Sequence, residues 1–328
     1  MKTEILTLLR ERSDYVSGQD LCQRFGVSRT AVWKVIGQLK EEGYEIESVP
    51  RKGYRLVQAP DILSQSELVS RMDAAWAGRN VHYFAETDST NQQAKRLAEA
   101  GAPHGTLVVA DMQTAGKGRR GRSWQQNPGE TIAMTLILRP DFPPEYASMI
   151  TLAAAHSVVK GIEKVTDMSP MIKWPNDVIV NRKKVCGILT EMGMNLEDGS
   201  IDHVVVGIGI NVNQTEFPED IRDIATSLRL EGSDSVQRSS LIAEVMRAFE
   251  QDYELLVERK CLSGILDEYN ARLINKDAAV KVLDPKGEFT GISLGINERG
   301  ELLVKKEDGT VAEVYAGEVS VRGFYGYV

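Results

Sequence analysis

The chain has 328 residues, enough for two or three domains with separate cores, and its 42% hydrophobic and 26% charged residues are typical of globular proteins. Its formal net charge of −8 argues against a protein that coats nucleic acid over its whole surface, and no apolar run approaches the roughly 20 residues that span a bilayer. Three widely separated cysteines (Cys22, Cys186 and Cys261) and four scattered histidines offer neither a disulfide framework nor a metal-ligand spacing, so we expect a cytoplasmic protein.

Three short helices are expected within residues 1–43. Ser17 precedes Asp20 by three residues, which is the spacing of a capped helix start, and Ser28 is a good N-cap for a third helix. Gly26 and Gly43 are positioned to end the second and the third helix. Two helices joined by a short turn of this kind form a helix-turn-helix.

A β-hairpin is expected after the third helix, because residues 44–47 and 54–56 alternate around a basic turn. This hairpin is the wing of a winged helix, and residues 1–60 carry a net charge of +2 within an acidic chain. We expect the exposed start of the third helix to enter a major groove and the basic turn to touch phosphates. The residues expected to contact DNA are Ser28, Arg29, Thr30, Lys34, Arg51 and Lys52. Trp33 and Cys22 are expected in the core, and a three-helix module for protein contacts is the alternative.

A glycine-rich motif follows in a second domain, beyond a linker expected at residues 57–66. After an apolar strand at 107–110, three glycines have the form G-x-G-x-x-G (Gly116, Gly118 and Gly121). The dinucleotide-binding fingerprint of this form requires a helix directly after the glycines. Here the chain continues into an apolar strand at 131–138, so we exclude a Rossmann site.

The same loop is dense in cations, with four of them between Lys117 and Arg122. Glycines let the backbone approach a ligand, and guanidinium groups grip phosphate oxygens. Because like charges repel, we expect the loop to become ordered when an anion neutralises it. The alternative is a solvated basic loop or a nuclear-localisation-like run, but Trp124 is a costly residue to leave beside a merely solvated loop.

Two further features of the second domain concern ligand binding. Residues 173–177 form an extended turn, which a proline imposes. This turn presents a lysine, an aromatic ring, an amide and a carboxylate within five positions, and a hairpin is expected after it at 178–189. Gly207 and Gly209 interrupt an apolar strand at 204–211. Glycines at such positions mark a place in a sheet where a ligand or a neighbouring backbone comes close.

Short strands dominate the end of the chain. Amphipathic helices at 238–259 and 263–272 are expected to close the second domain, after which the hydrophobic period changes from that of helices to that of strands. The expected strands are 280–283, 291–296, 302–305 and 319–322, separated by turns. They are expected to form a small barrel.

The order of these motifs resembles that of the biotin–protein ligases. The motifs that carry the resemblance are Ser89-Thr90-Asn91, Gln113, the loop 116–124, Lys173-Trp174-Pro175-Asn176-Asp177, Lys184-Val185-Cys186-Gly187-Ile188-Leu189 and Gly207-Ile208-Gly209-Ile210-Asn211. With the winged helix ahead of them, the chain is similar over nearly its whole length to the bacterial proteins that are both biotin–protein ligase and biotin-operon repressor. One departure is visible, because the loop of that family usually reads G-R-G-R-R-G-R whereas position 117 is lysine, which keeps the charge but loses the bidentate fork.

The resemblance implies an α+β fold in three parts. These are a winged helix-turn-helix DNA-binding domain at 1–60, a central mixed-sheet ligase domain of the class II synthetase type at 66–272, and an SH3-like β-barrel at 273–328. The implied reaction has two steps, in which the biotin carboxylate attacks the α-phosphorus of ATP and a lysine amine of a biotin carboxyl carrier protein then displaces AMP from biotinyl-adenylate. The resemblance also implies Mg²⁺, and a homodimer of the adenylate-bound protein that represses biotin genes at operator DNA.

The resemblance further implies the roles of individual residues. The implied catalytic residues are Lys184, Arg119, Arg122 and Lys173. The implied biotin-binding residues are Ser89, Thr90, Asn91, Gln113, Lys117, Gly118, Arg119 and Lys184. The residues implied to bind ATP or the adenylate are Gly116, Arg119, Arg122, Trp124, Lys173, Asn176 and Asn211, and Asp177 is implied to reach Mg²⁺ through water. Two alternatives stay open, namely a lipoate-type protein ligase and a non-catalytic transcription factor that senses biotin.

Overall fold

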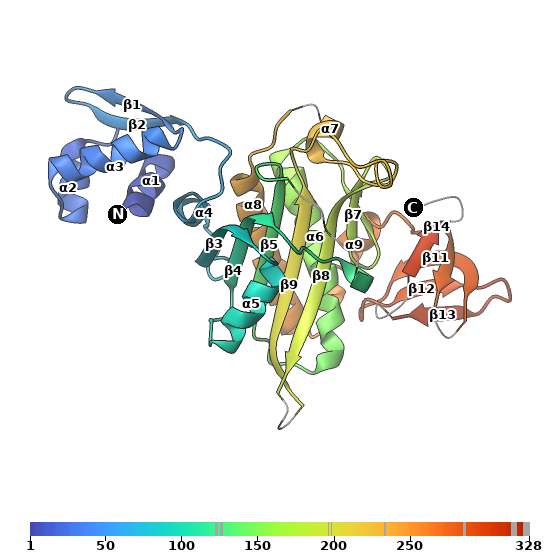
Figure 1. Ribbon diagram of the computed structural model, residues 1–328. Coiled ribbons are helices and arrows are strands. Elements are labelled where there is room, and N and C mark those ends of the chain that lie inside the picture. Colours follow the sequence, from blue (N-terminus) through green and yellow to red (C-terminus); the bar gives the residue numbers. More distant parts are fainter. Residues whose placement is uncertain are drawn as a thin grey trace.

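A computed structural model gives the fold of residues 1–121, 124, 127–195, 197, 199–232, 234–284, 287–315 and 320–323, with the backbone alone at 120, 320, 322 and 323. Three parts follow one another along this described chain (Figure 1). They are a small helical part at the N-terminus, a central sheet covered by helices, and a C-terminal part made of strands.

The N-terminal part is a winged helix. Its elements are α1 (Lys2–Glu11), α2 (Gly18–Phe25), α3 (Arg29–Glu41) and the antiparallel hairpin of β1 (Glu45–Val49) and β2 (Gly53–Gln58). The Ser17 hydroxyl accepts a hydrogen bond from the Asp20 backbone at 3.0 Å, and the Ser28 hydroxyl accepts one from the Ala31 backbone at 3.2 Å. Gly26 ends α2 in the left-handed region at φ 63°. The predicted helix-turn-helix and wing are therefore confirmed.

Trp33 lies outside the core of the winged helix, so our expectation for this residue is wrong. The buried face of α3 follows the helical period and consists of Val32, Val35, Ile36 and Leu39. Trp33 stands one residue, or about 100° of helical rotation, beyond Val32 and is 69% exposed. Cys22, by contrast, is half-buried against the core, as expected.

A seven-stranded mixed sheet forms the central part, in the order β3-β4-β5-β9-β8-β7-β6. Its strands are β3 (Asn80–Thr87), β4 (Thr106–Gln113), β5 (Thr131–Leu138), β6 (Met171–Lys173), β7 (Asp177–Val180), β8 (Lys183–Met194) and β9 (Ile201–Asn211). Only β3 and β4 run parallel, and the other neighbouring strands are antiparallel. Within its described residues the glycine-rich loop contains one 3-10 turn (Arg119–Gly121) and leads into β5, which is the strand predicted at 131–138.

Helices cover both faces of this sheet (Figure 1). The long helices α6 (Ala147–Val165) and α8 (Arg238–Arg259) pack on one face around the main apolar core, and α5 (Thr90–Glu99) packs on the other. The remaining helical elements are α4 (Gln65–Arg71), a 3-10 turn (Pro144–Tyr146), α7 (Leu228–Gly232), a second such turn (Leu262–Gly264) and α9 (Leu266–Ala271). The helix predicted at 238–259 is confirmed, whereas the one predicted at 263–272 is a 3-10 turn followed by the shorter α9. Among the described residues, no helix combines the length and apolar character that crossing a membrane requires.

The C-terminal part is one antiparallel sheet in the order β13-β12-β11-β10-β14. Its strands are β10 (Ala279–Leu283), β11 (Phe289–Ile296), β12 (Leu302–Lys305), β13 (Val311–Val314) and β14 (Ser320–Gly323). Four of the five were predicted, and closure of the sheet into an SH3-like barrel stays a prediction. The buried Trp174 indole N–H donates to the Gly300 carbonyl at 3.1 Å, which connects this part to the central sheet.

The segment that follows the wing is anchored to the central part. The Asp61 carboxylate accepts hydrogen bonds from the Arg238 backbone at 2.9 Å and from its guanidinium Nε at 3.1 Å, and Asn213 donates to it at 3.0 Å. Arg238, which is buried, also donates to Asp111 near the end of β4 at 2.6 Å. The residues expected to be a linker therefore include a fixed attachment point, while the exact domain limits stay a prediction.

Candidate active site

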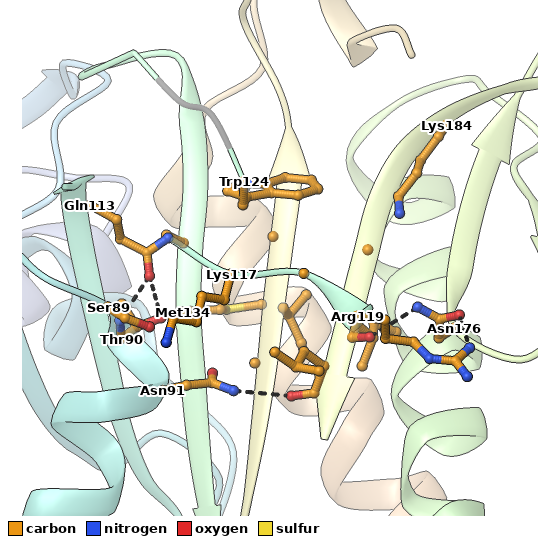
Figure 2. Close-up of a pocket in the computed structure, with 18 residues that line it drawn as sticks. Ser89, Thr90, Asn91, Gln113, Lys117, Arg119, Trp124, Met134, Asn176 and Lys184 are labelled. Atoms are coloured by element: carbon orange, nitrogen blue, oxygen red, sulfur yellow. Dashed lines mark hydrogen bonds between the residues drawn. The ribbon is translucent and has the colours of Figure 1, made fainter. Parts of the chain in front are cut away.

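A pocket opens where the glycine-rich loop crosses the sheet, above β5, β9 and β8 and beside the N-terminus of α5 (Figure 2). The pocket and its open mouth hold about 470 Å³ of empty space. Ten of the residues predicted for the site line it, namely Ser89, Thr90, Asn91, Gln113, Lys117, Gly118, Arg119, Trp124, Asn176 and Lys184. The structure adds Ala133, Met134, Gly187, Ile188, Leu189, Gly207, Ile208 and Gly209. The pocket thus has one polar end, one cationic end and apolar walls.

The polar end is built on the start of α5. The Gln113 side-chain carbonyl accepts hydrogen bonds from the Thr90 backbone N–H at 2.8 Å and from the Thr90 hydroxyl at 3.0 Å. Gln113 therefore satisfies an N-terminal donor of the helix that a capping side chain would otherwise satisfy. Ser89 occupies the N-cap position, but its hydroxyl makes no capping hydrogen bond and is left to line the pocket.

Thr135, which the sequence analysis did not identify, connects this polar end to the floor. Its hydroxyl lies 2.8 Å from the Thr90 hydroxyl and 2.7 Å from Asn91 Oδ1. Each hydroxyl carries a single proton, so two protons serve the contacts that join Thr90 to Gln113, Thr135 to Thr90 and Thr135 to Asn91. In any one arrangement of the hydroxyl protons, one of these three contacts therefore carries no proton.

An ion pair lies behind the polar floor. The Asn91 amide donates to Glu191 at 2.8 Å and to the Leu189 carbonyl at 3.2 Å, and Lys95 pairs with Glu191 at 2.6 Å. Burial opposes ionisation of Glu191, but the hydrogen bonds from Lys95 and Asn91 outweigh it and lower the pKa of the carboxyl group. Glu191 is therefore a carboxylate at neutral pH and fixes the orientation of the Asn91 amide. A side chain at Gly207 would collide with that amide, so glycine is required there.

The cationic end is formed by Lys184, which reaches toward the glycines of the sheet (Figure 2). Its ammonium lies 2.6 Å from the Asp177 carboxylate on the neighbouring strand and 6.0 Å from the centre of the Trp124 ring. A Cβ atom at Gly187 would lie 2.9 Å from the Lys184 ammonium, and one at Gly209 would lie 2.7 Å from the Trp124 ring. The two glycines therefore leave the space that the lysine and the indole occupy above the sheet.

Arg119 is attached to the opposite wall. Its guanidinium donates to the Asn176 side-chain carbonyl at 2.9 Å. The Asn176 side-chain amide in turn donates to the Ile188 carbonyl at 3.1 Å, and the backbone carbonyl of Asn176 accepts from the Ile188 backbone N–H at 2.9 Å. The two side-chain hydrogen bonds therefore determine which way the Asn176 amide points, and the one from Arg119 places the loop arginine over the pocket (Figure 2).

The remaining predicted residues that the structure describes do not line the pocket. Lys173 and Asp177 are buried beside it, Gly116 lies at the base of the loop, and Arg122 is outside the described residues. The Asn211 amide donates to the Thr226 carbonyl at 3.1 Å and its side-chain oxygen accepts from Gln214 at 3.3 Å, so its contacts are internal. The role expected for Asn211 at the nucleotide stays a prediction without a described contact that favours it.

The site is built for positioning rather than for covalent catalysis. Cys186, the cysteine on β8, is fully buried, and burial raises the pKa of its thiol far above the usual range, so it is no nucleophile. Within the described ranges no group of three or more histidine, cysteine, aspartate or glutamate side chains gathers to hold a metal ion. The chemistry available is the hydrogen bonding of a polar group at one end of the pocket and the binding of anionic groups at the other.

The residues expected to contact DNA lie together on the winged helix. Ser28, Arg29, Thr30 and Lys34 are exposed at the start of α3, and Arg51 and Lys52 are exposed in the turn between β1 and β2. The Lys52 ammonium lies 5.7 Å above the Tyr15 ring, and Arg55 lies 5.0 Å above the same ring. Basic groups of the wing thus gather around one aromatic side chain.

Comparison with known proteins agrees with this architecture. Residues 83–211 match the model of the biotin/lipoate A/B protein ligase family, residues 2–55 match a helix-turn-helix domain, and residues 278–322 match the biotin protein ligase C-terminal domain. Fold and site therefore define a protein ligase of the biotin and lipoate class that carries a helix-turn-helix module.

Individual relatives narrow the class. The chain is 41% identical to the bifunctional ligase/repressor BirA of Bacillus spizizenii and 40% identical to that of Bacillus subtilis, in each case over 94% of both chains. It also resembles the structure of a biotin protein ligase from Aquifex aeolicus in complex with biotin and ATP, with a TM-score of 0.65 and 33% identity over 75% of this chain and 99% of that one. The chain belongs to the BirA family of bifunctional ligase/repressors.

Proposed function

We propose that this protein attaches biotin to a lysine of a biotin carboxyl carrier protein through biotinyl-5′-AMP, and that the adenylate-bound protein represses biotin genes. The observation that carries the proposal is the pairing of two ends in one pocket. The polar end of Ser89, Thr90 and Gln113 suits a ureido ring, and the cationic end of Lys184 and Arg119 suits a carboxylate and a phosphate.

In the first step the biotin carboxylate attacks the α-phosphorus of ATP, the bond to the β-phosphate oxygen breaks, and pyrophosphate leaves. Lys184 holds the carboxylate against the phosphorus, and Asp177 holds Lys184 in place from 2.6 Å away. Arg119, Arg122 and Lys173 neutralise the phosphate oxygens on which charge develops. Asn211 and the Trp124 indole, which lies above the glycines of β8 and β9, help to form the nucleotide site.

In the second step the carrier lysine, as a free amine, attacks the carbonyl carbon of the mixed anhydride, and AMP leaves while the amine loses a proton. The loop from Gly116 to Arg119 must open for that lysine and stay closed until it arrives. Lys117 and Gly118 close over biotin, and Arg119 is secured by its hydrogen bond to Asn176. The loop thus protects a reactive anhydride from water.

Mg²⁺ fits this site as a companion of the ATP phosphates rather than as a resident of the protein. Mg²⁺ is usually held by one or two carboxylates together with phosphate oxygens and water. Asp177 already pairs with Lys184, so this carboxylate would reach the ion through water. The ion would neutralise phosphate charge.

Repression requires two winged helices to reach two half-sites, and we propose that a homodimer supplies them. An edge of the central sheet supports this part of the proposal. The outer neighbour β7 pairs with β8 only as far as Gly187, and in the described part of β8 no strand covers that side beyond it. Met192 and Met194, each 39% exposed, lie on this stretch, which offers backbone and apolar groups to a second copy. We further propose that the protein works in the cytoplasm, where its three free thiols stay reduced.

The first experiment is ATP–pyrophosphate exchange with biotin, with lipoate and with neither acid. Exchange that depends on biotin supports adenylate formation, and exchange that depends on lipoate instead assigns the pocket to the other ligase type. The absence of exchange with both acids contradicts the enzymatic part and leaves a sensor. Duplex binding is then compared in the presence and absence of biotin and ATP, because equal binding contradicts adenylate-dependent repression.

A further inference from the structure

Trp33 is the most exposed of the large hydrophobic side chains described for the chain, at 69%. It lies on α3, five residues after the N-cap Ser28, in a helix whose opposite face fills the core of the winged helix. A tryptophan carries the largest apolar surface of any residue, so its place on the solvent side of a well-packed helix calls for a binding partner.

The exposed residues of α3 form one continuous face. Arg29, Thr30, Trp33 and Lys34 are all exposed, and Gly37 is half-exposed one turn further on. At about 100° of rotation per residue, these five positions span an arc of about 140° on the helix, and Trp33 lies between Arg29 and Thr30 within it. Because helical side chains point toward the N-terminus, the indole covers the part of the face where the first turn begins.

Gly37 provides a second, independent observation on the same face. A Cβ atom built at this position meets nothing within 4 Å, so packing inside the protein does not require a glycine there. A glycine within an exposed helix lowers helix stability relative to alanine. Because Gly37 has no side chain, a partner has room to approach the helix backbone one turn after Trp33, beside the indole.

The charges around this face select the partner. Arg29 and Lys34 border Trp33 on α3, and Arg51 and Lys52 lie in the wing, while the chain as a whole carries a net charge of −8. A polyanion is attracted by such a local concentration of cations, whereas the same face of a second copy of this chain would bring like charge. We propose that Trp33 is a base-reading residue, whose indole lies against base edges in the major groove and contacts the C5-methyl group of a thymine, with Gly37 giving the duplex its clearance.

This inference rests on the proposed binding of duplex DNA and adds a sequence-reading role to it. Cations on a helix contact phosphates without regard to sequence, whereas an apolar group in the major groove distinguishes thymine by its methyl group. Loss of Trp33 should therefore weaken binding to a preferred duplex and leave binding to other duplexes unchanged. The loss of affinity caused by removing Trp33 should also be independent of the salt concentration, unlike the loss caused by removing an arginine or a lysine.

The experiment enriches duplexes from a random-sequence library with the full-length protein in the presence of biotin and ATP. The affinity of W33A, W33F and the unaltered protein is then measured for the enriched duplex and for unselected duplex. We expect W33A to bind the enriched duplex at least about tenfold more weakly and W33F to recover part of the loss, with unselected binding and the salt slope unchanged. Q38A, on the same helix but about 140° of helical rotation from Trp33, is the matched control, and biotin-dependent pyrophosphate exchange verifies the fold of each variant.

Two further arms identify the contact. Thymine is replaced by uracil at each enriched position in turn. At one or more positions this replacement should weaken duplex binding by the unaltered protein and leave binding by W33A unchanged. The G37L substitution should weaken binding to the enriched duplex as W33A does. Equal affinity of W33A and the unaltered protein, or equal weakening on both duplexes, overturns the base-reading role. Loss of the adenylate-bound dimer in W33A, measured by sedimentation, assigns the indole to a protein contact instead. Failure of the unaltered protein to enrich any duplex overturns the DNA interface itself and Trp33 with it.

Discussion

The Lys184 ammonium lies 2.6 Å from the carboxylate of Asp177, and the two residues come from the neighbouring strands β8 and β7. The lysine side chain retains some exposure to the pocket, whereas the aspartate is buried behind it. A lysine has four rotatable bonds and loses much conformational freedom when it is fixed at one point. Asp177 therefore acts as a positioning residue that holds the cation where an acid is to be activated.

The D177N variant tests this positioning. Removing the carboxylate charge takes away a charge-assisted contact, for which a loss of about 1.5–3 kcal/mol is usual, so we expect the kcat of biotin-dependent pyrophosphate exchange to fall by about 10- to 150-fold. Because Asp177 acts through Lys184, the K184A/D177N double variant should be no slower than K184A alone. Losses that simply add in the double variant would contradict this role and assign an independent one to Asp177.

The loop arginine is expected to retain the intermediate. R119G removes the guanidinium that hydrogen-bonds Asn176 over the pocket, and N176A keeps the guanidinium but removes its acceptor, together with the hydrogen bond from the Asn176 amide to the Ile188 carbonyl. We expect R119G to release biotinyl-5′-AMP at least about tenfold faster, because a hydrogen bond to a charged group is worth about 1.5–3 kcal/mol. N176A should give a smaller acceleration. Release is measured from preloaded enzyme with labelled biotin, and R299G, in an exposed C-terminal turn, is the control. An unchanged release rate in R119G would contradict the proposal that Arg119 retains the adenylate.

Thr135 is expected to organise the polar end of the pocket. T135V keeps the shape of the side chain but removes the hydroxyl that lies within 2.8 Å of both Thr90 and Asn91. We expect the Kd for biotin to rise by about five- to tenfold, equivalent to roughly 1 kcal/mol, in titration calorimetry. T131V is a matched control on the same strand, because the Thr131 hydroxyl is buried without a hydrogen-bond partner among the described residues. Similar losses in both variants would show a general effect on β5 instead.

Thr135 also illustrates what the sequence alone left unpredicted. The winged helix was predictable because caps, turns and the helical period are local, as at Ser28 and Gly26. The pocket was predictable because the order of several motifs is specific even where each residue alone is not. Thr135, however, occupies an ordinary position in an apolar strand, and its role arises only when the fold brings β5 under the start of α5.

The features that the sequence analysis predicted wrongly or missed have physical causes too. Trp33 was assigned to the core by its hydrophobicity, although the buried face of α3 was already defined by Val32 and Ile36. The strand β13 was omitted because its apolar residues do not mark a buried face, since Val311 is exposed and only Val314 is buried. The pairing of Lys95 with Glu191 behind Asn91 joins positions about a hundred residues apart and has no local sequence signal.

Glu67 on α4 connects the winged helix to the ligase part by four hydrogen bonds. Its Oε2 accepts from the Tyr44 hydroxyl at 2.5 Å and from the Arg10 guanidinium, both of the winged helix. Its Oε1 accepts from Arg71 and from Ser239 on α8, each at 2.7 Å. Burial raises the energy of this carboxylate, but Arg10, the Tyr44 hydroxyl and Arg71 outweigh that effect and lower its pKa.

The E67Q variant should therefore loosen the attachment of the winged helix. Removing the charge leaves Arg10 and Arg71 facing each other, and we expect a loss of about 3–5 kcal/mol in the free energy of unfolding of the full chain, with biotin-dependent exchange retained. A carboxyl with a lowered pKa stabilises the fold above its unfolded pKa, of about 4.3, and this contribution is lost as the pH falls through the folded value. Urea unfolding between pH 3 and 7 should thus show a steeper acid loss in the unaltered protein than in E67Q. E47Q is the matched control, because Glu47 also accepts from a tyrosine and an arginine but at the exposed surface, where such contacts contribute little. Equal effects of E67Q and E47Q would mean that burial of Glu67 does not stabilise the junction.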